Sequence, residues 1–159
     1  MKYELVKTDT VKSWDGRTLY RIRALVTILG VVNVGGLGGY IEKEKNLSQV
    51  SDKAWVSDKA QVFGEARVSG EARVSGEAQV SGEALVSPVY IGGMRWSVTI
   101  TDMQMSIGCQ THKIARWDKF TDAQISAMDS QALDWWSKNK TGIMALAKTH
   151  AQSVKDKPA

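Results

Sequence analysis

A strict six-residue repeat constrains the fold of this chain more than any other feature of its sequence. Valine recurs at every sixth position from Val50 to Val86, and alanine recurs at every sixth position from Ala54 to Ala84. An α-helix places apolar residues three and four positions apart, and a half-buried strand places them at alternate positions, so neither element has this period. The repeat predicts short strands separated by corners, with the valines filling the interior.

The third position of each hexad carries a residue type that tolerates left-handed backbone angles, as a sharp corner requires. These residues are Asp52, Asp58, Gly64, Gly70, Gly76 and Gly82. If three hexads complete one turn, residues 18 apart lie at the strand spacing of about 4.8 Å. That register places Lys53 beside Glu71 and Lys59 beside Glu77, which are favourable cross-strand pairs.

The hexads resemble the hexapeptide-repeat, left-handed parallel β-helix family, and the unit Val-Ser-Gly-Glu-Ala-Arg at residues 68–73 fits its pattern. Two flanking segments, Leu-Gly-Gly-Tyr-Ile-Glu at 37–42 with Asn-Leu-Ser at 46–48, and Arg-Trp-Ser-Val-Thr-Ile-Thr-Asp at 95–102, are similar to phage and prophage proteins with a polymer-forming-type β-helix. The left hand is implied by this resemblance alone, because the usual crossover preference is right-handed. The resemblance also implies assembly as a homotrimer.

Regular elements are expected on both sides of the repeats. Residues 3–7 and 18–25 alternate as strands, and the pair Asp15 and Gly16 between them is a strong hairpin signal. Residues 96–107 contain two further alternating runs that would close the end of the coil. Thr121 and Gln124 form a capping box for a short helix, and a longer amphipathic helix follows from about Ser130.

The sequence thus predicts a mainly β fold: a left-handed parallel β-helix of hexapeptide repeats with an N-terminal β-hairpin and a C-terminal β-hairpin plus α-helices. We expect four parts. Residues 1–46 form the hairpin and a lead-in segment, 47–88 the repeats, 89–120 the terminal strands and 121–159 the helical region.

Catalytic motifs are weak in this chain. Hexapeptide acyltransferases use a histidine in or near the coils as a general base, whereas His112 and His150 both lie after the repeats. Cys109 near His112 lacks a third orienting group, and we expect it to be a buried free thiol. The glycines at 35–39 lack the Lys and Ser/Thr of a phosphate loop and indicate a turn. No Cys/His spacing predicts a metal site. We therefore expect no enzyme activity and no cofactor.

The densest cluster of cations and aromatic rings follows the last predicted strand. It comprises His112, Lys113, Arg116, Trp117 and Lys119, with Arg95 and Trp96 as candidates for the same surface. Cations beside an indole can hold a phosphate while the ring stacks on a base. The alternative is a basic loop with one tryptophan packed beneath it.

Three functional classes remain open. The first is a non-catalytic phage-type binding protein, a counter-defence sponge that sequesters a small anionic ligand, such as a cyclic nucleotide immune signal, in clefts between subunits. The second is a protein-binding module that inhibits a host defence factor through exposed residues of the hexads, with Trp55, Arg67 and Arg73 as interface anchors. The third is a divergent hexapeptide acyltransferase that uses His112.

Charge and hydropathy place looser limits on these classes. The net charge of +4 allows a mildly anionic partner but makes general nucleic-acid binding a weaker hypothesis. The N-terminus has no apolar signal core, and residues 25–41 are too short and too rich in glycine for a membrane span. We expect a protein of the cytoplasm, the host cytoplasm if phage-encoded, with no membrane role.

Overall fold

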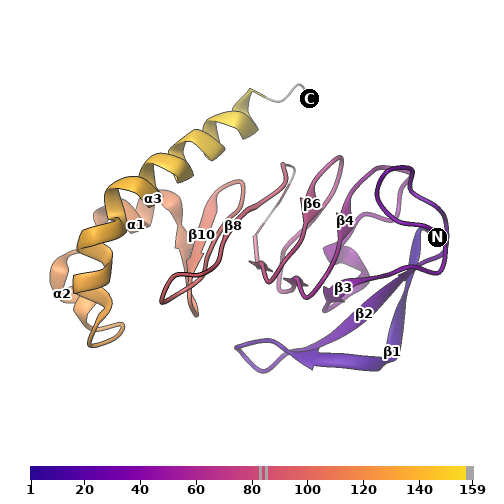
Figure 1. Ribbon diagram of the computed structural model, residues 1–159, viewed down its shortest axis with the longest axis horizontal. Coiled ribbons are helices and arrows are strands. Elements are labelled where there is room, and N and C mark those ends of the chain that lie inside the picture. Colours follow the sequence, from indigo (N-terminus) through magenta and orange to yellow (C-terminus); the bar gives the residue numbers. More distant parts are fainter. Residues whose placement is uncertain (83, 85, 157–159) are drawn as a thin grey trace.

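The computed structural model describes residues 1–82, 84 and 86–156. The chain advances along an elongated molecule, from an N-terminal hairpin at one end to a group of helices at the other (Figure 1). The last helix then runs back toward the middle of the molecule. The hexads lie between the hairpin and the C-terminal strands.

The N-terminal hairpin has the predicted turn but longer strands. Strand β1 (Tyr3–Lys12) pairs antiparallel with β2 (Thr18–Ala24), and Gly16 in the turn has a φ of 87°. Strand β3 (Leu37–Ile41) pairs antiparallel with β2, so two of the glycines expected in a turn lie in a strand instead. A 3-10 turn, η1 (Glu44–Asn46), leads from β3 to the hexads.

The hexads form strands of two residues each. Strand β4 (Trp55–Val56) pairs in parallel with β6 (Arg73–Val74), and β5 (Gln61–Val62) pairs in parallel with β7 (Gln79–Val80). Residues 18 apart are therefore partners at these two places, as the spacing predicts. Val68 makes isolated bridges with Leu47 and Ala84 rather than a strand.

Local details of the repeat agree with its sequence in part. Asp58 has a φ of 57°, in the left-handed region, as do Gly64, Gly70 and Gly76 at corresponding corners, whereas Asp52 and Gly82 do not. The Lys53 ammonium lies 3.8 Å from the Glu71 carboxylate, but the described residues Lys59 and Glu77 form no such pair. Each valine from Val56 to Val80 and each alanine from Ala54 to Ala84 is buried, whereas Val50 is 68% exposed and lies outside the interior.

The predicted fold class is nevertheless wrong: the molecule is not a mainly β, left-handed parallel β-helix. The described strands form three small sheets, of which one is five-stranded and mixed, with order β1-β2-β3-β5-β7. A second is four-stranded and antiparallel, and among the described residues β4 and β6 alone make a wholly parallel sheet. The physical reason is that two-residue strands offer few ladder hydrogen bonds, so β5 and β7 extend the sheet that the hairpin begins.

The C-terminal strands form the four-stranded antiparallel sheet, of order β11-β10-β9-β8, rather than a single hairpin. Its strands are β8 (Val89–Ile91), β9 (Val98–Ile100), β10 (Gln104–Ile107) and β11 (Gln110–Lys113). Gly108, with a φ of 56°, occupies the turn between β10 and β11. This sheet carries its own apolar face, which the helices cover.

Three α-helices follow the strands in the described part of the chain. Helix α1 (Ile114–Lys119) occupies the end of the segment 89–120 that the sequence assigned to the terminal strands, and it follows β11 directly. Helix α2 (Asp122–Ser126) begins at the predicted capping box of Thr121 and Gln124, with both hydrogen bonds present. Helix α3 (Ala132–Lys155) starts close to the predicted residue and continues through Gly142. No helix in the described part of the chain is long and apolar enough to cross a membrane.

Candidate functional site

The predicted cluster of cations and rings lies on β11 and the short helix α1. Ile114 and Trp117, three positions apart, point into the core, while Lys113, Arg116 and Lys119 are exposed. Residues three and four positions apart share one helix face, so burial of the apolar pair turns the cations toward solvent. The segment therefore presents its charges on one side and its indole on the other.

Trp117 is a core residue in this structure. Its side chain is 2% exposed, and its indole Nε1 donates a hydrogen bond of 2.7 Å to the backbone oxygen of Met105. The ring centroid lies 5.4 Å from that of Trp136 and 5.4 Å from that of Phe120. An indole held in this way is not exposed beside Lys113 and Lys119, so it cannot stack on a base whose phosphate those lysines hold.

His112 sits half-buried above the same core. Its Nε2 lies 3.1 Å from the Gln110 side-chain oxygen, and its ring packs edge-on against Phe120 at 4.9 Å. Burial lowers the pKa of His112, and the nearby Arg116 guanidinium lowers it further. The neutral imidazole is therefore favoured at neutral pH. The described contacts of His112 contain no carboxylate that would orient it as a general base.

Arg95 and Trp96 lie at a different place from the lysines. The Arg95 guanidinium is 4.9 Å from the Trp96 ring centroid, and Trp96 packs edge-on against Trp135 of α3 at 5.5 Å. Trp96 and Trp117 line one pocket, whereas Lys113 and Lys119 line another. The structure thus separates the residues that the sequence grouped into one surface.

The lysines border an apolar groove of about 520 Å³ between α1, the turn before β10 and the C-terminal half of α3. The apolar residues of the groove are Met103, Ile114, Ala115, Met144, Ala151 and Val154. Lys113 and Lys119 come from the β11–α1 side, and Lys148 and Lys155 come from α3. Met103 is 69% exposed, so the groove is open to solvent.

The charges of this groove are unevenly compensated. Asp102 and Asp118 are the acidic residues in the described lining, and the Asp118 carboxylate lies 3.4 Å from the Lys148 ammonium and 3.6 Å from that of Lys140. These lysines, Lys148 first, lower the pKa of Asp118. Within the described residues, the ammonium groups of Lys113, Lys119 and Lys155 make no hydrogen bond or ion pair. The groove therefore combines an apolar surface with uncompensated positive charge.

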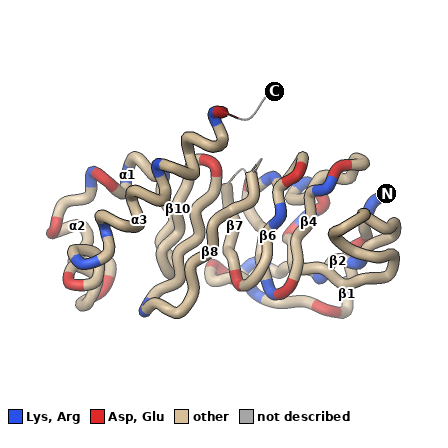
Figure 2. Tube along the Cα trace, turned by 45° about the horizontal axis from the view of Figure 1, so that its top comes forward, with Lys and Arg blue, Asp and Glu red and all other residues tan. Residues whose placement is uncertain are grey.

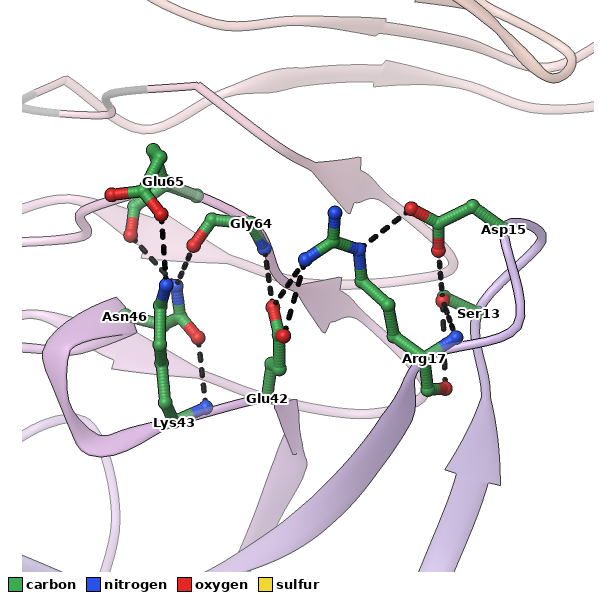
Figure 3. Close-up of polar contacts among 9 residues, drawn as sticks. Ser13, Asp15, Arg17, Glu42, Lys43, Asn46, Gly64 and Glu65 are labelled. Atoms are coloured by element: carbon green, nitrogen blue, oxygen red, sulfur yellow. Dashed lines mark hydrogen bonds and ion pairs between the residues drawn. The ribbon is translucent and has the colours of Figure 1, made fainter.

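Basic residues near the hairpin turn are, by contrast, neutralised. Arg17 pairs with Asp15 at 2.7 Å and with Glu42 at 3.1 Å, as Figure 3 shows. Glu42 also accepts the Gly64 backbone N–H at 2.7 Å, and Lys43 pairs with Glu65 at 2.9 Å. Basic and acidic residues are intermingled along the hairpin and hexads (Figure 2). These hydrogen bonds and ion pairs link the hairpin turn to a hexad corner, and they leave few unpaired charges that could bind a ligand.

Two predictions of side-chain burial or exposure are wrong. Trp55, predicted to be an exposed interface anchor, is 3% exposed and packs edge-on against Tyr3 at 6.5 Å. Arg67 and Arg73 are exposed, as expected for side chains that point away from the valines. Cys109, predicted to be buried, is exposed at the β10–β11 turn. Position in the hexad does not fix burial where the hairpin covers the outside of a strand.

The groove was not predicted from the sequence, although part of its signal is present. Lys148, Ala151 and Lys155 recur at helical spacing along one face of α3. No known family model matches the chain, and no curated protein matches its sequence. Among the described residues, no group of three His, Cys, Asp or Glu side chains is arranged to hold a metal ion.

Proposed function

We propose that this protein is a non-catalytic binding protein that holds a small anionic ligand in the groove between α1 and α3. The observation that supports this proposal is the pair Lys113 and Lys119, which have no ionic partner among the described residues and border an apolar surface. Both lysines belong to the ligand-binding set that the sequence predicts.

The size and charge of the groove suit such a ligand. A volume of about 520 Å³ falls in the range of roughly 300 to 1,000 Å³ that is typical of small-molecule sites. Lysine ammonium groups bind phosphate and carboxylate as point charges, and the aliphatic surface between them contacts the apolar part of the ligand. Lys113 and Lys155 lie on different elements, so an anion that contacts both would bridge β11 and α3.

The resemblance of the flanking segments to phage proteins motivates the finer proposal of a counter-defence sponge in the host cytoplasm, with a cyclic nucleotide immune signal as the ligand. The groove is formed within one chain, so this site does not depend on an intersubunit cleft. Homotrimer assembly stays a separate prediction. Inhibition of a host protein through the hexads is less favoured, because one of its three anchors, Trp55, is buried.

The test is calorimetric titration with cyclic mono-, di- and trinucleotides and with decyl phosphate. We expect one of these probes to bind, and the double variant Lys113→Gln/Lys119→Gln to weaken its binding at least about tenfold, because each charge-assisted contact is worth roughly 1.5 to 3 kcal/mol before screening. A matched control is Lys7→Gln/Lys59→Gln, which removes the same charge from exposed positions elsewhere.

The outcomes separate the claims. Binding of a cyclic nucleotide that the groove variant loses and the control keeps would support the sponge. Binding of decyl phosphate alone would replace the nucleotide with an anionic amphiphile. Equal loss in both variants would reduce the effect to net charge, and absence of binding by every probe would overturn the proposal.

A further inference from the structure

A second pocket lies at the opposite end of the C-terminal sheet, beside the β10–β11 turn. Four of the six tryptophans of the chain line it. They are Trp96, Trp117, Trp135 and Trp136. These rings come from the β8–β9 connection, α1 and α3, so three parts of the fold converge on one small cavity.

The rings are set at angles to one another. Trp96 and Trp135 are nearly perpendicular, with an interplanar angle of 84°, while Trp117 and Trp136 are tilted by 47°. Rings in such an arrangement border a guest on several sides instead of stacking on one plane. The indole of Trp117 is fixed by its hydrogen bond to the backbone of β10, and Trp136 is 5% exposed, so half of the cage is held rigidly by the core.

The charge of the lining is negative. Asp129, three positions before the first residue of α3, is the one residue with a formal charge among the described residues of the lining. One of its carboxylate oxygens accepts the Gln131 backbone N–H at 2.8 Å. Most of the remaining lining is apolar, namely Ile107, Ile125, Met128 and Ala132. Arg95, which lies over the Trp96 ring at 4.9 Å, illustrates the attraction of these indoles for a cation.

The volume limits the guest. The cavity measures about 110 Å³, whereas a cavity of about 150 Å³ is large enough for benzene. Cys109 in the lining is exposed, so the cavity is open on that side and need not enclose a guest completely. A methylated ammonium group is compact, and its diffuse positive charge suits both indole faces and a carboxylate. We propose that this pocket is an aromatic cage for the methylated ammonium group of an organic cation.

This inference is independent of the anionic ligand proposed for the α1–α3 groove, because the two pockets share no lining residue. A purely apolar guest would contact the same rings but would gain nothing from Asp129. The experiment must therefore compare a cation with a neutral molecule of the same shape.

The first arm is a titration with choline, with tetramethylammonium and with 3,3-dimethyl-1-butanol, the neutral isostere of choline. Binding is followed by tryptophan fluorescence and by calorimetry. We expect both cations to bind and the isostere to bind at least about fivefold more weakly, since a desolvated cation–π contact is worth roughly 1 to 2 kcal/mol. Equal affinity for choline and its isostere would overturn the cation cage and leave an apolar pocket.

The second arm uses variants that spare the fold. Asp129→Asn keeps the oxygen that accepts the Gln131 N–H but removes the charge, and it should weaken choline binding severalfold. Asp134→Asn, at an exposed carboxylate in the first turn of α3, is the matched control. Trp135→Phe, at a half-buried ring, should also weaken choline binding, whereas Trp14→Phe in the distant hairpin should not. No difference between each variant and its control would contradict the proposal.

The third arm distinguishes the source of the cation and gives a readout that does not depend on variants. A trimethyllysine peptide and its unmodified counterpart are compared with free choline, so that preference for the peptide would identify a methylated protein side chain. Cys109 lines the pocket and is exposed, so bound cation should slow its alkylation by a bulky maleimide. An unchanged alkylation rate at saturating cation would place the binding elsewhere.

Discussion

Alanine at Gly38 tests the close approach of β3 to the hexads. A Cβ atom added there would lie 2.5 Å from the Val56 carbonyl oxygen and 2.5 Å from the Ile22 Cγ1 atom. Val56 belongs to β4, whose backbone pairs with β6, so the carbonyl cannot simply turn away. The conflict is steric rather than conformational, and it arises because two sheets meet at this glycine.

The magnitude follows from the cost of overpacking. Inserting a methyl group into a packed interior costs about 1 to 3 kcal/mol, which lowers the melting temperature by roughly 2 to 12 °C in a chain of this size. Gly142 supplies the opposite case: nothing lies within 4 Å of an added Cβ, and the residue is inside α3. Gly142→Ala should therefore stabilise the protein by about 0.5 to 1 kcal/mol through helix propensity.

Urea denaturation followed by circular dichroism measures both variants under the same conditions. The expected result is a lower midpoint for Gly38→Ala and a higher midpoint for Gly142→Ala. A Gly38→Ala protein whose free energy of unfolding lies within about 0.5 kcal/mol of the parent would refute the close packing between β3 and β4.

Three further predictions concern buried polar groups. Burial lowers the pKa of His150, and Asp102 opposes that shift only in part. Below about pH 6.5 the unfolded chain therefore binds more protons than the folded chain, so the free energy of unfolding should be highest above that pH and should fall below it. His150→Gln should flatten the dependence of the urea midpoint on pH between about pH 5 and 7.5. Trp117→Phe removes the indole N–H that bonds to β10 and should cost about 1 to 3 kcal/mol in unfolding free energy, whereas an unchanged thermal midpoint would contradict the buried hydrogen bond. Lys2 is 3% exposed, and its ammonium lies 2.6 Å from the Asp52 carboxylate. Lys2→Ala should lower the free energy of unfolding by about 3 kcal/mol. A calorimetric loss of less than half of this value would show that solvent already satisfies the carboxylate.

Local elements were largely predictable from the sequence because their signals are short-range. The pair Asp15 and Gly16 forms the predicted turn, and Thr121 forms the predicted capping box with Gln124. The buried hexad residues from Val56 to Val80 follow from the six-residue period alone. Each of these outcomes depends on residues that are neighbours in the sequence or repeat at a fixed spacing.

The candidate sites were predicted less completely. Lys113 and Lys119 were identified as ligand-binding candidates, but the groove also needs Lys148 and Lys155, more than 28 residues further along the chain. Trp117 was grouped with the same cations, but its ring lies on the buried face of α1 and does not line the groove. Residues that are neighbours in the sequence lie on opposite faces of a helix, so burial of one face separates them.

The sequence by itself determined four of the six corners, the buried valines and alanines, the register of 18 residues at β4 and β5, and the starts of α2 and, within a few residues, α3. Tertiary structure alone decided how the strands divide into sheets, because β5 pairs with β7 as the period predicts and also pairs with β3 at the edge of the hairpin sheet. It also decided that Trp55 is covered, that Cys109 is exposed and that four tryptophans meet around one cavity. Periodicity specifies which face of a strand is apolar, but only the packing of distant segments specifies what covers the other face.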